Sequence, residues 1–105
     1  MEIRFDKPYL EELYDTGATT DKKYRFQPQI AKKYRKTIDI LESVSVVEDL
    51  FRYNGMRYEV LHGDREGLES VRVNDQYRIE FKTTKAVSQT VVTICNIIEL
   101  SNHYN

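Results

Sequence analysis

Two arginines in the stretch "HGDREGLESVRVNDQYRIEF", residues 62–81, are spaced so that they meet across a predicted β-hairpin. Residues 74–76, Asn-Asp-Gln, indicate a three-residue loop between two strands of alternating polarity. That loop sets Arg72 directly opposite Arg78, on the face that does not carry the valines. Like charges directly across a strand pair are destabilising by up to about 1 kcal/mol, so a negative group is expected beside them.

This negative group has two candidate sources. One is a carboxylate of the protein itself, because Glu80 lies diagonal to Arg72 in this register and Glu99 follows in the last predicted strand. The other is a bound anion, and a phosphate suits two planar guanidinium groups well. The register alone favours the carboxylate over the anion.

The chain contains few other side chains that could transfer protons near neutral pH or bind a transition metal. His62 precedes Gly63 at a predicted strand end, His103 lies close to the C-terminus, and histidine titrates near neutral pH. These two histidines and Cys95, the single cysteine, do not have the spacing of a zinc site. The sequence therefore predicts neither a metal nor another cofactor, and it contains no known nucleophile-and-base triad motif.

A basic segment lies between residues 22 and 36. It contains no acidic residue, although the whole chain has a net charge of −1. Such a local excess of charge marks either an interaction surface or a solvated helix face, and the pattern is compatible with both. The basic residues of this segment are Lys22, Lys23, Arg25, Lys32, Lys33, Arg35 and Lys36.

The elements that must position these residues divide the chain into two halves. Residues 1–7 indicate a short strand, residues 8–17 a helix, and residues 28–52 a longer helical stretch that breaks at residues 43–45. The second half changes to short strands, with residues 82–89 as a longer connection before the last one. The four predicted strands are residues 56–63, 68–74, 76–83 and 89–100. This order predicts an α+β domain with its helices on one face of a mostly antiparallel sheet.

Composition limits the class of protein. A chain of 105 residues predicts one domain spanning residues 1–105, and a single cysteine excludes an intramolecular disulfide. No apolar run approaches the roughly 18 residues that a membrane span requires, and the N-terminus lacks a signal pattern. We therefore expect a cytoplasmic protein without a membrane partner.

The central stretch resembles HigB-like toxins, the plasmid maintenance killer branch of the RelE/ParE superfamily. These toxins share a glycine-flanked turn, a Ser-(Ile/Val)-x-Val strand, a short loop and an aromatic-Arg-Ile-x-Phe strand. The resemblance extends upstream to "KYR" and "LESVSVVEDL", and it implies the same α+β fold. The matching central residues are Leu61, Gly63, Asp64, Arg65, Glu66, Gly67, Ser70, Val71, Val73, Asn74, Tyr77, Arg78, Ile79 and Phe81.

The resemblance implies the toxin of a type II toxin–antitoxin pair, with a HigA-like helix-turn-helix antitoxin as partner. Such toxins are ribosome-dependent endoribonucleases that cleave mRNA without a metal, through attack of a ribose 2′-hydroxyl on the adjacent phosphate. On this interpretation Arg78 and Arg72 face the scissile phosphate, and the substrate is the anion that offsets their repulsion. The basic residues between 22 and 36 would contact RNA or the ribosome.

Other site residues carry over less directly. A histidine of the family falls near Glu59, which is a candidate proton acceptor in its place, and His62 stands where relatives often have a lysine. Relatives often end in Asp-Tyr-His. A gapless alignment places Glu99 at the position of this aspartate. A shift of two residues instead brings His103 and Tyr104 into the terminal motif, and we favour the shifted alignment.

Two other functions fit the same resemblance. ParE-like toxins of this superfamily inhibit DNA gyrase through protein contacts and cleave no RNA. A degenerate toxin would still bind its antitoxin without cleaving, and the altered C-terminus keeps this alternative open. The hairpin arginines favour the endoribonuclease over the gyrase inhibitor.

Overall fold

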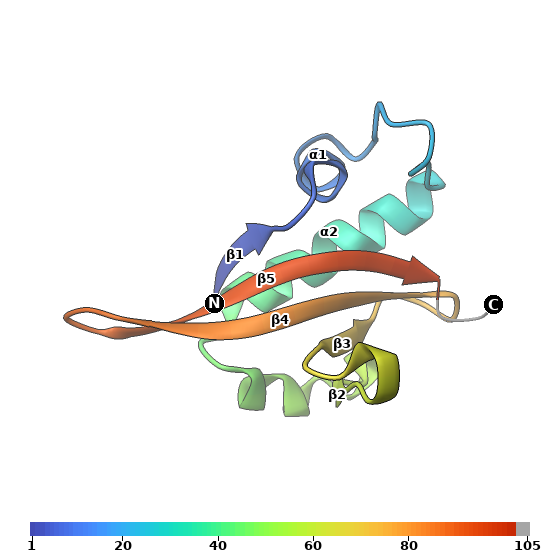
Figure 1. Ribbon diagram of the computed structural model, residues 1–105. Helices are drawn as coiled ribbons and strands as arrows, with labels where there is room; N and C mark the ends of the chain where they lie inside the picture. Colours follow the sequence, from blue (N-terminus) through green and yellow to red (C-terminus); the bar gives the residue numbers. More distant parts are fainter. Residues whose placement is uncertain (103–105) are drawn as a thin grey trace.

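A computed structural model of the protein describes residues 1–102, and Figure 1 shows its arrangement. Within these residues a sheet of five strands has the order β1-β5-β4-β3-β2, with β1 parallel to β5 and the other pairs antiparallel. The predicted α+β class, with helices on one face of a mostly antiparallel sheet, is confirmed. The elements are β1 (Glu2–Phe5), α1 (Pro8–Thr16), α2 (Pro28–Ser43), η1 (Val47–Arg52), η2 (Asn54–Met56), β2 (Glu59–Val60), η3 (Gly63–Arg65), β3 (Glu69–Arg72), β4 (Tyr77–Val87) and β5 (Val91–Asn102).

The two α-helices begin and end where the sequence predicts. Each starts at a proline, whose missing N–H costs nothing in the first turn. Helix α1 ends at Gly17, which has a φ of 79° and donates its N–H to the carbonyl of Leu13 at 2.9 Å. In α2 the hydroxyl of Tyr34 donates to the carbonyl of Leu10 at 2.8 Å and ties the two helices together. Within residues 1–102, no helix is long and apolar enough to span a membrane.

The core lies between the helices and one face of the sheet. The apolar stripe of α2 is buried as predicted, and it packs with apolar residues of α1, β3, β4 and β5. Figure 1 shows α2 behind β4 and β5, so that the opposite face of these strands is left without a helix. The fully buried residues include Leu10, Leu13, Tyr34, Ile38, Leu41, Val71, Ile79, Phe81 and Ile97.

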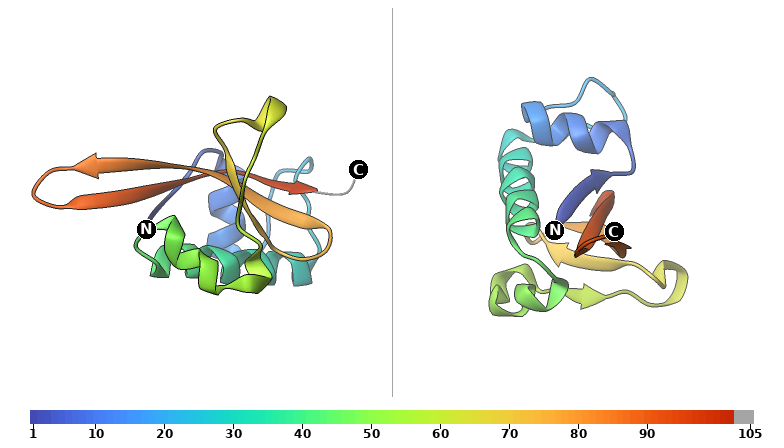
Figure 2. Two further views of the ribbon diagram at one scale, coloured as in Figure 1. Left: turned by 90° about the horizontal axis from the view of Figure 1, so that it is seen from below. Right: turned by 90° about the vertical axis from the view of Figure 1, so that its left-hand side faces the viewer.

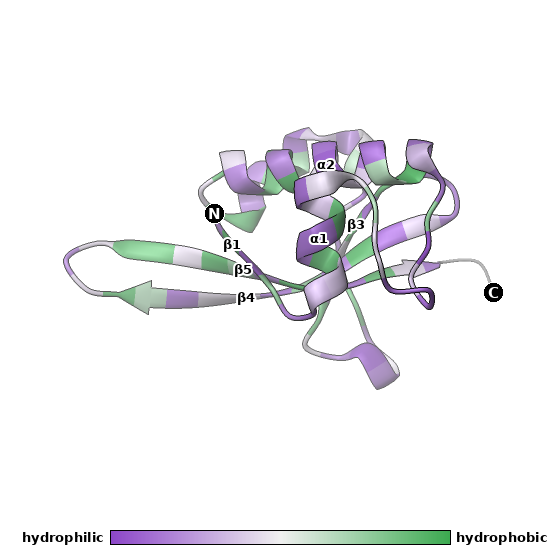
Figure 3. Ribbon diagram, turned by 90° about the horizontal axis from the view of Figure 1, so that it is seen from above, coloured by the Kyte–Doolittle hydropathy of each residue, from purple (hydrophilic) through white to green (hydrophobic). Residues whose placement is uncertain are grey.

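Strands β4 and β5 extend beyond the rest of the sheet as a two-stranded arm (Figures 1 and 2). The prediction of a loop at residues 82–89 is wrong, because Lys82 to Val87 continue β4 and pair with β5 as far as Val91. The segment contains two threonines and a valine, which are compatible with an exposed strand, and only a short turn remains. The arm ends in exposed apolar side chains, with Val87 74% exposed and Val91 63% exposed, and Figure 3 shows this hydrophobic tip.

The remaining differences from the prediction lie around β2. This strand is only Glu59–Val60, whereas the sequence predicts residues 56–63, because the short helical turns η2 and η3 occupy either end. The loop that contains η3 projects from the sheet toward the side opposite α2 (Figure 2). This position allows side chains of the loop to reach the open face of the sheet.

Candidate active site

The predicted hairpin register is confirmed, with Arg72 opposite Arg78 and Ser70 opposite Glu80. These side chains lie on the face of β3 and β4 that the helices leave uncovered, since Val71 and Ile79 point into the core. A cavity of about 150 Å³ opens on this face. It is lined by Arg57, Glu59, Ser70, Arg72, Asn74, Tyr77 and Arg78.

Glu80 is the buried anchor beside this cavity. Its side chain is completely inaccessible to solvent, although it belongs to the uncovered face. Arg78 donates from Nε to Glu80 Oε2 at 3.1 Å, and its Nη2 forms an ion pair with the same oxygen at 2.9 Å. Arg65 donates from Nη1 to Oε1 at 2.9 Å. A buried carboxylate requires such partners, because an unpaired buried charge is strongly destabilising. Glu80 therefore offsets the charge of Arg78 and not, as its diagonal position suggested, that of Arg72.

Arg78 and Glu59 both line the cavity and lie close enough to form an ion pair. Nη1 is the one guanidinium nitrogen of Arg78 that does not bind Glu80, and it lies 3.8 Å from Oε1 of Glu59. The Arg78 side chain is only 20% exposed, whereas that of Glu59 is 56% exposed. A guanidinium of fixed direction and an accessible carboxylate at this separation can bind a phosphate and accept a proton, respectively.

Arg72 is held by the turn that follows it. Its Nε donates to the carbonyl of Asn74 at 3.1 Å, and its Nη2 forms an ion pair with Asp75. The Asn74 side chain stabilises the same turn by accepting from the backbone N–H of Tyr77 at 2.7 Å. Each of the two opposed arginines thus has a carboxylate partner, so the expectation that the substrate must offset their repulsion is wrong.

Arg65 connects the projecting loop to the sheet. Besides Glu80 it approaches Oε2 of Glu99 at 3.5 Å, and Lys7 lies 3.9 Å from the other oxygen of Glu99. Both partners of Arg65 thus lie outside its own turn, on β4 and β5. Glu99 itself does not line the cavity and stands next to it, directly across from Glu80 on β5.

Arg57 is a cavity residue that sequence reasoning missed. It ends η2 with a φ of 45°, the single positive φ among the non-glycine residues that the structure describes. A left-handed backbone costs a side-chain-bearing residue on the order of 1 kcal/mol, and here it turns the chain from the buried Met56 toward β2. Nothing in the local residue pattern predicts this conformation.

The other candidate residues are not brought to the cavity. His62 is exposed, immediately before η3, and does not line the cavity. His103 and Tyr104 lie outside the described residues. Burial raises the pKa of the Cys95 thiol to about 12, so this cysteine is no nucleophile at neutral pH. Within residues 1–102, no cluster of three or more potential metal ligands is present.

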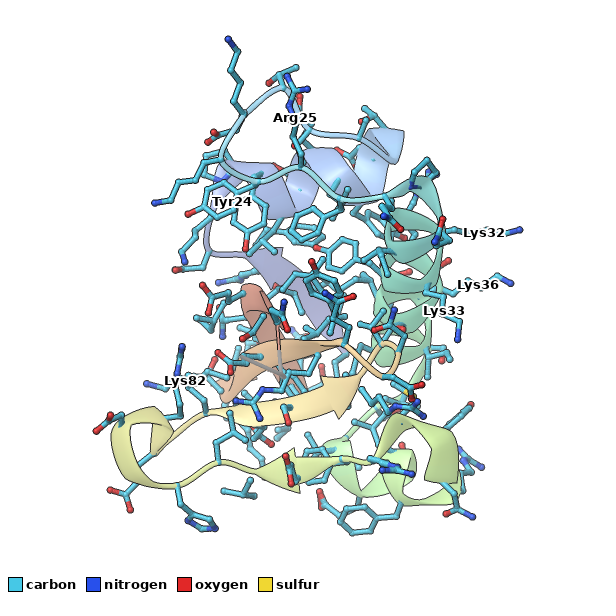
Figure 4. The ribbon with its side chains drawn as sticks, turned by 90° about the vertical axis from the view of Figure 1, so that its right-hand side faces the viewer. Tyr24, Arg25, Lys32, Lys33, Lys36 and Lys82 are labelled. Carbon is cyan, nitrogen blue, oxygen red and sulfur yellow. The ribbon has the colours of Figure 1, made fainter. Side chains whose placement is uncertain are left out.

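The basic segment divides into three parts. Lys32, Lys33 and Lys36 are exposed and point outward from α2, on the opposite side from Lys82 of β4 (Figure 4). Arg35 instead stabilises the end of α1, because its Nε donates to the carbonyl of Tyr14 at 2.7 Å. The third part lies in the loop before α2 and consists of Lys22, Lys23 and Arg25.

Solved structures with the same arrangement define the class of fold. The YoeB/ParE toxin from Agrobacterium tumefaciens superposes with a TM-score of 0.55 at 16% identity, covering 99% of this chain and 100% of that one. A mutant of YafQ from E. coli gives a TM-score of 0.50 at 12% identity, covering 97% and 92% of the two chains. The protein thus has the α+β fold of RelE/YoeB-like toxins.

Sequence comparison narrows this class to one family. The family model described as the RelE-like toxin HigB of type II toxin–antitoxin systems matches residues 3–94. Toxin HigB-1 of Vibrio cholerae serotype O1 is 33% identical over 89 residues, which cover 84% of this chain and 90% of that protein. The chain belongs to the HigB-like toxins of type II toxin–antitoxin systems, and the resemblance found in its central stretch is confirmed.

Proposed function

We propose that this HigB-like toxin is a metal-independent endoribonuclease that cleaves mRNA on the translating ribosome. The observation that carries the proposal is the position of the Arg78 guanidinium. Its Nε and Nη2 bind the buried Glu80, and its Nη1 lies 3.8 Å from the Glu59 carboxylate. A fixed guanidinium and an accessible carboxylate at one cavity are the groups that phosphodiester cleavage by an internal hydroxyl requires. Membership of the HigB-like family supports the same chemistry.

In the proposed reaction the ribose 2′-oxygen attacks the adjacent phosphorus atom. The proton of the 2′-hydroxyl passes to the Glu59 carboxylate, and Arg78 stabilises the charge that builds up on the non-bridging phosphate oxygens. The bond from phosphorus to the 5′-oxygen breaks, which leaves a 2′,3′-cyclic phosphate and a 5′-hydroxyl. Arg72 is a second phosphate contact in this scheme, since it lies opposite Arg78 in the cavity wall.

The departing 5′-oxygen needs a proton donor. We propose that the C-terminal segment supplies this proton, with His103 and Tyr104 as candidates and Glu99 as the acid of the gapless alignment. His62 remains a candidate contact to the RNA because it borders the same projecting loop as Arg65. These assignments rest on the family resemblance.

The proposal also names partners. A HigA-like helix-turn-helix antitoxin would bind and neutralise the toxin, and both would act in the cytoplasm, where the ribosome is. The exposed Lys22, Lys23 and Arg25 of the loop and Lys32, Lys33 and Lys36 of α2 are proposed contacts to ribosomal RNA or mRNA. Arg35 is a weaker candidate for this role because its guanidinium is already bonded to the end of α1.

Mapping of RNA ends after induced expression tests the proposal. We expect growth arrest and mRNA cuts in phase with codons. Glu59→Gln and Arg78→Ala should each reduce cleavage by about 10²-fold or more. Arg52→Ala, an exposed arginine outside the cavity, is the matched control and should cleave normally. Arrest with DNA breaks and intact mRNA would support a ParE-like toxin, and no arrest would support a degenerate one.

A further inference from the structure

A row of four aromatic rings leads away from the cavity toward the N-terminal helices. Tyr77 lines the cavity and meets the ring of Phe26 edge to face, with 5.6 Å between the ring centroids. Phe26 lies 6.3 Å from Tyr9, and Tyr9 stacks on Tyr24 at 3.8 Å with an angle of 2° between the rings. The row therefore joins the candidate active site to the loop that carries Lys22, Lys23 and Arg25.

A second cavity lies at the far end of this row. Its volume is about 550 Å³, larger than that of the first cavity. It is lined by Lys7, Pro8, Tyr9, Glu12, Thr20, Asp21 and Tyr24. Figure 4 shows Tyr24 on the same side of the molecule as Lys82, whereas the lysines of α2 point to the other side.

Tyr24 is held in place by its own loop. Its N–H donates to the carbonyl of Asp21 at 3.1 Å, and its carbonyl accepts a hydrogen bond from the hydroxyl of Thr19. The acidic groups of the cavity are engaged as well, since Glu12 accepts from the backbone N–H of Thr20 at 2.8 Å. A ring fixed in this way loses little conformational freedom when a ligand binds.

The Tyr24 ring is half-buried, with one stacked aromatic neighbour and the exposed side chain of Lys23 over it. Tyr9 covers one face, and among residues 1–102 no second ring packs against Tyr24. The ammonium group of Lys23 lies 5.4 Å from the ring centroid, and Lys7 lines the same cavity. An aromatic surface flanked by lysines is the combination with which proteins bind single-stranded nucleic acid, because every base has a π-face and every nucleotide a phosphate.

We infer that Tyr24 is a stacking platform for a base of the single-stranded RNA, separate from the cavity where the chain is cut. This inference rests on the proposed function, because it gives the substrate a second contact along the row of rings. Lys7 and Lys23 contact the phosphates next to the stacked base. The loop part of the basic segment thus contacts the substrate, while the lysines of α2 face elsewhere.

Fluorescence offers a direct test, since the chain contains no tryptophan. Tyr24→Trp places a single indole on the platform, and a short unstructured RNA with 2′-O-methyl riboses binds without being cut. We expect saturable quenching of this indole as the RNA is added. Phe51→Trp, at a ring that is 61% exposed and outside the row, is the control and should not be quenched. Equal responses of the two indoles would overturn the inference.

Cleavage by translating ribosomes provides a second measurement. Tyr24→Leu should raise the toxin concentration needed for half-maximal cleavage roughly tenfold, whereas Tyr24→Phe keeps the ring and should match the wild type. Circular dichroism melting checks that both variants fold. If Tyr24→Leu cleaves at the wild-type concentration, the platform is absent and the proposed endoribonuclease stands. If the wild type neither cleaves mRNA nor binds the RNA, the proposed function fails and this inference fails with it.

Discussion

Arg78 and Glu80 lie two residues apart on β4 and are joined at one carboxylate oxygen by a hydrogen bond of 3.1 Å and an ion pair of 2.9 Å. Alternate residues of a strand share a face, so this spacing alone brings the two side chains together. Arg65 holds the other oxygen of Glu80 from a separate loop. The result is a carboxylate that solvent does not reach, held between two guanidinium groups, and these bonds direct the remaining N–H groups of Arg78.

Removing the charge of Glu80 should impair both stability and cleavage. Glu80→Gln keeps the size of the side chain but removes the buried charge that binds both Arg65 and Arg78, and we expect the free energy of unfolding to fall by about 2 kcal/mol. Urea unfolding measures this loss. Arg78 would also lose its fixed direction, so cleavage should fall further than the fraction of unfolded protein explains. A Glu80→Gln protein as stable and as active as the wild type would show that the charge of Glu80 has no role.

The exposed ion pair of Arg72 with Asp75 should be weaker than the ion pair of Arg65 with the buried Glu80. Asp75 is 95% exposed, so Asp75→Asn should change the free energy of unfolding by less than about 0.5 kcal/mol, because solvent and salt screen the pair with Arg72. Arg65→Ala removes a bond to the buried Glu80 and should be the more destabilising change. Unfolding at low and high salt separates the two, since only the exposed pair should depend strongly on ionic strength. Equal losses for both variants would contradict this ranking.

The register of the site was predictable, whereas its ion pairs were not. The alternation of residues and the length of the loop determine that Arg72 opposes Arg78, because a strand has a period of two. The second partner of Glu80, Arg65, comes from the projecting loop, and the path of that loop depends on tertiary packing that no local pattern encodes. For the same reason the left-handed Arg57 and its place in the cavity were missed.

The length of β4 was mispredicted for a related reason. Lysine and threonine in residues 82–87 are common in both loops and exposed strands, so composition alone does not decide between them. The pairing with β5 determines that this segment is a strand. Lys85 lies opposite Thr93 and Val87 opposite Val91, a register that follows from the tertiary structure. The predicted core needed no such information, because burial of α2 follows from its helical periodicity.

Alkaline pH should destabilise the protein through buried groups that include Cys95 and Tyr9. Burial raises the pKa of Cys95 from 9.0 to about 12 and that of Tyr9 from 10.0 to about 12, so the folded state retains protons that the unfolded state loses. Stability is therefore complete below pH 9 and falls as the pH rises toward 12, with a slope approaching 1.4 kcal/mol per pH unit for each group.

Urea midpoints between pH 7.5 and 11 measure this loss. Cys95→Ala lowers stability at every pH because it leaves a small cavity, but it should reduce the slope above pH 9. The comparison of slopes removes the constant cost of the substitution. Identical slopes for the variant and the wild type would mean that the thiol does not contribute.

The arm of β4 and β5 should contribute little to the stability of the isolated protein, in spite of its hydrophobic tip. Val87 and Val91 face each other across the arm and are 74% and 63% exposed, so little of their apolar surface leaves water on folding. Replacing both by threonine preserves the β-branched shape and should change the free energy of unfolding by less than about 0.5 kcal/mol. Ile79→Ala, in the core beneath the cavity, is the control and should cost about 2–5 kcal/mol. A loss above 1 kcal/mol for the double threonine variant that grows with protein concentration would instead show that the tip is buried against a second copy.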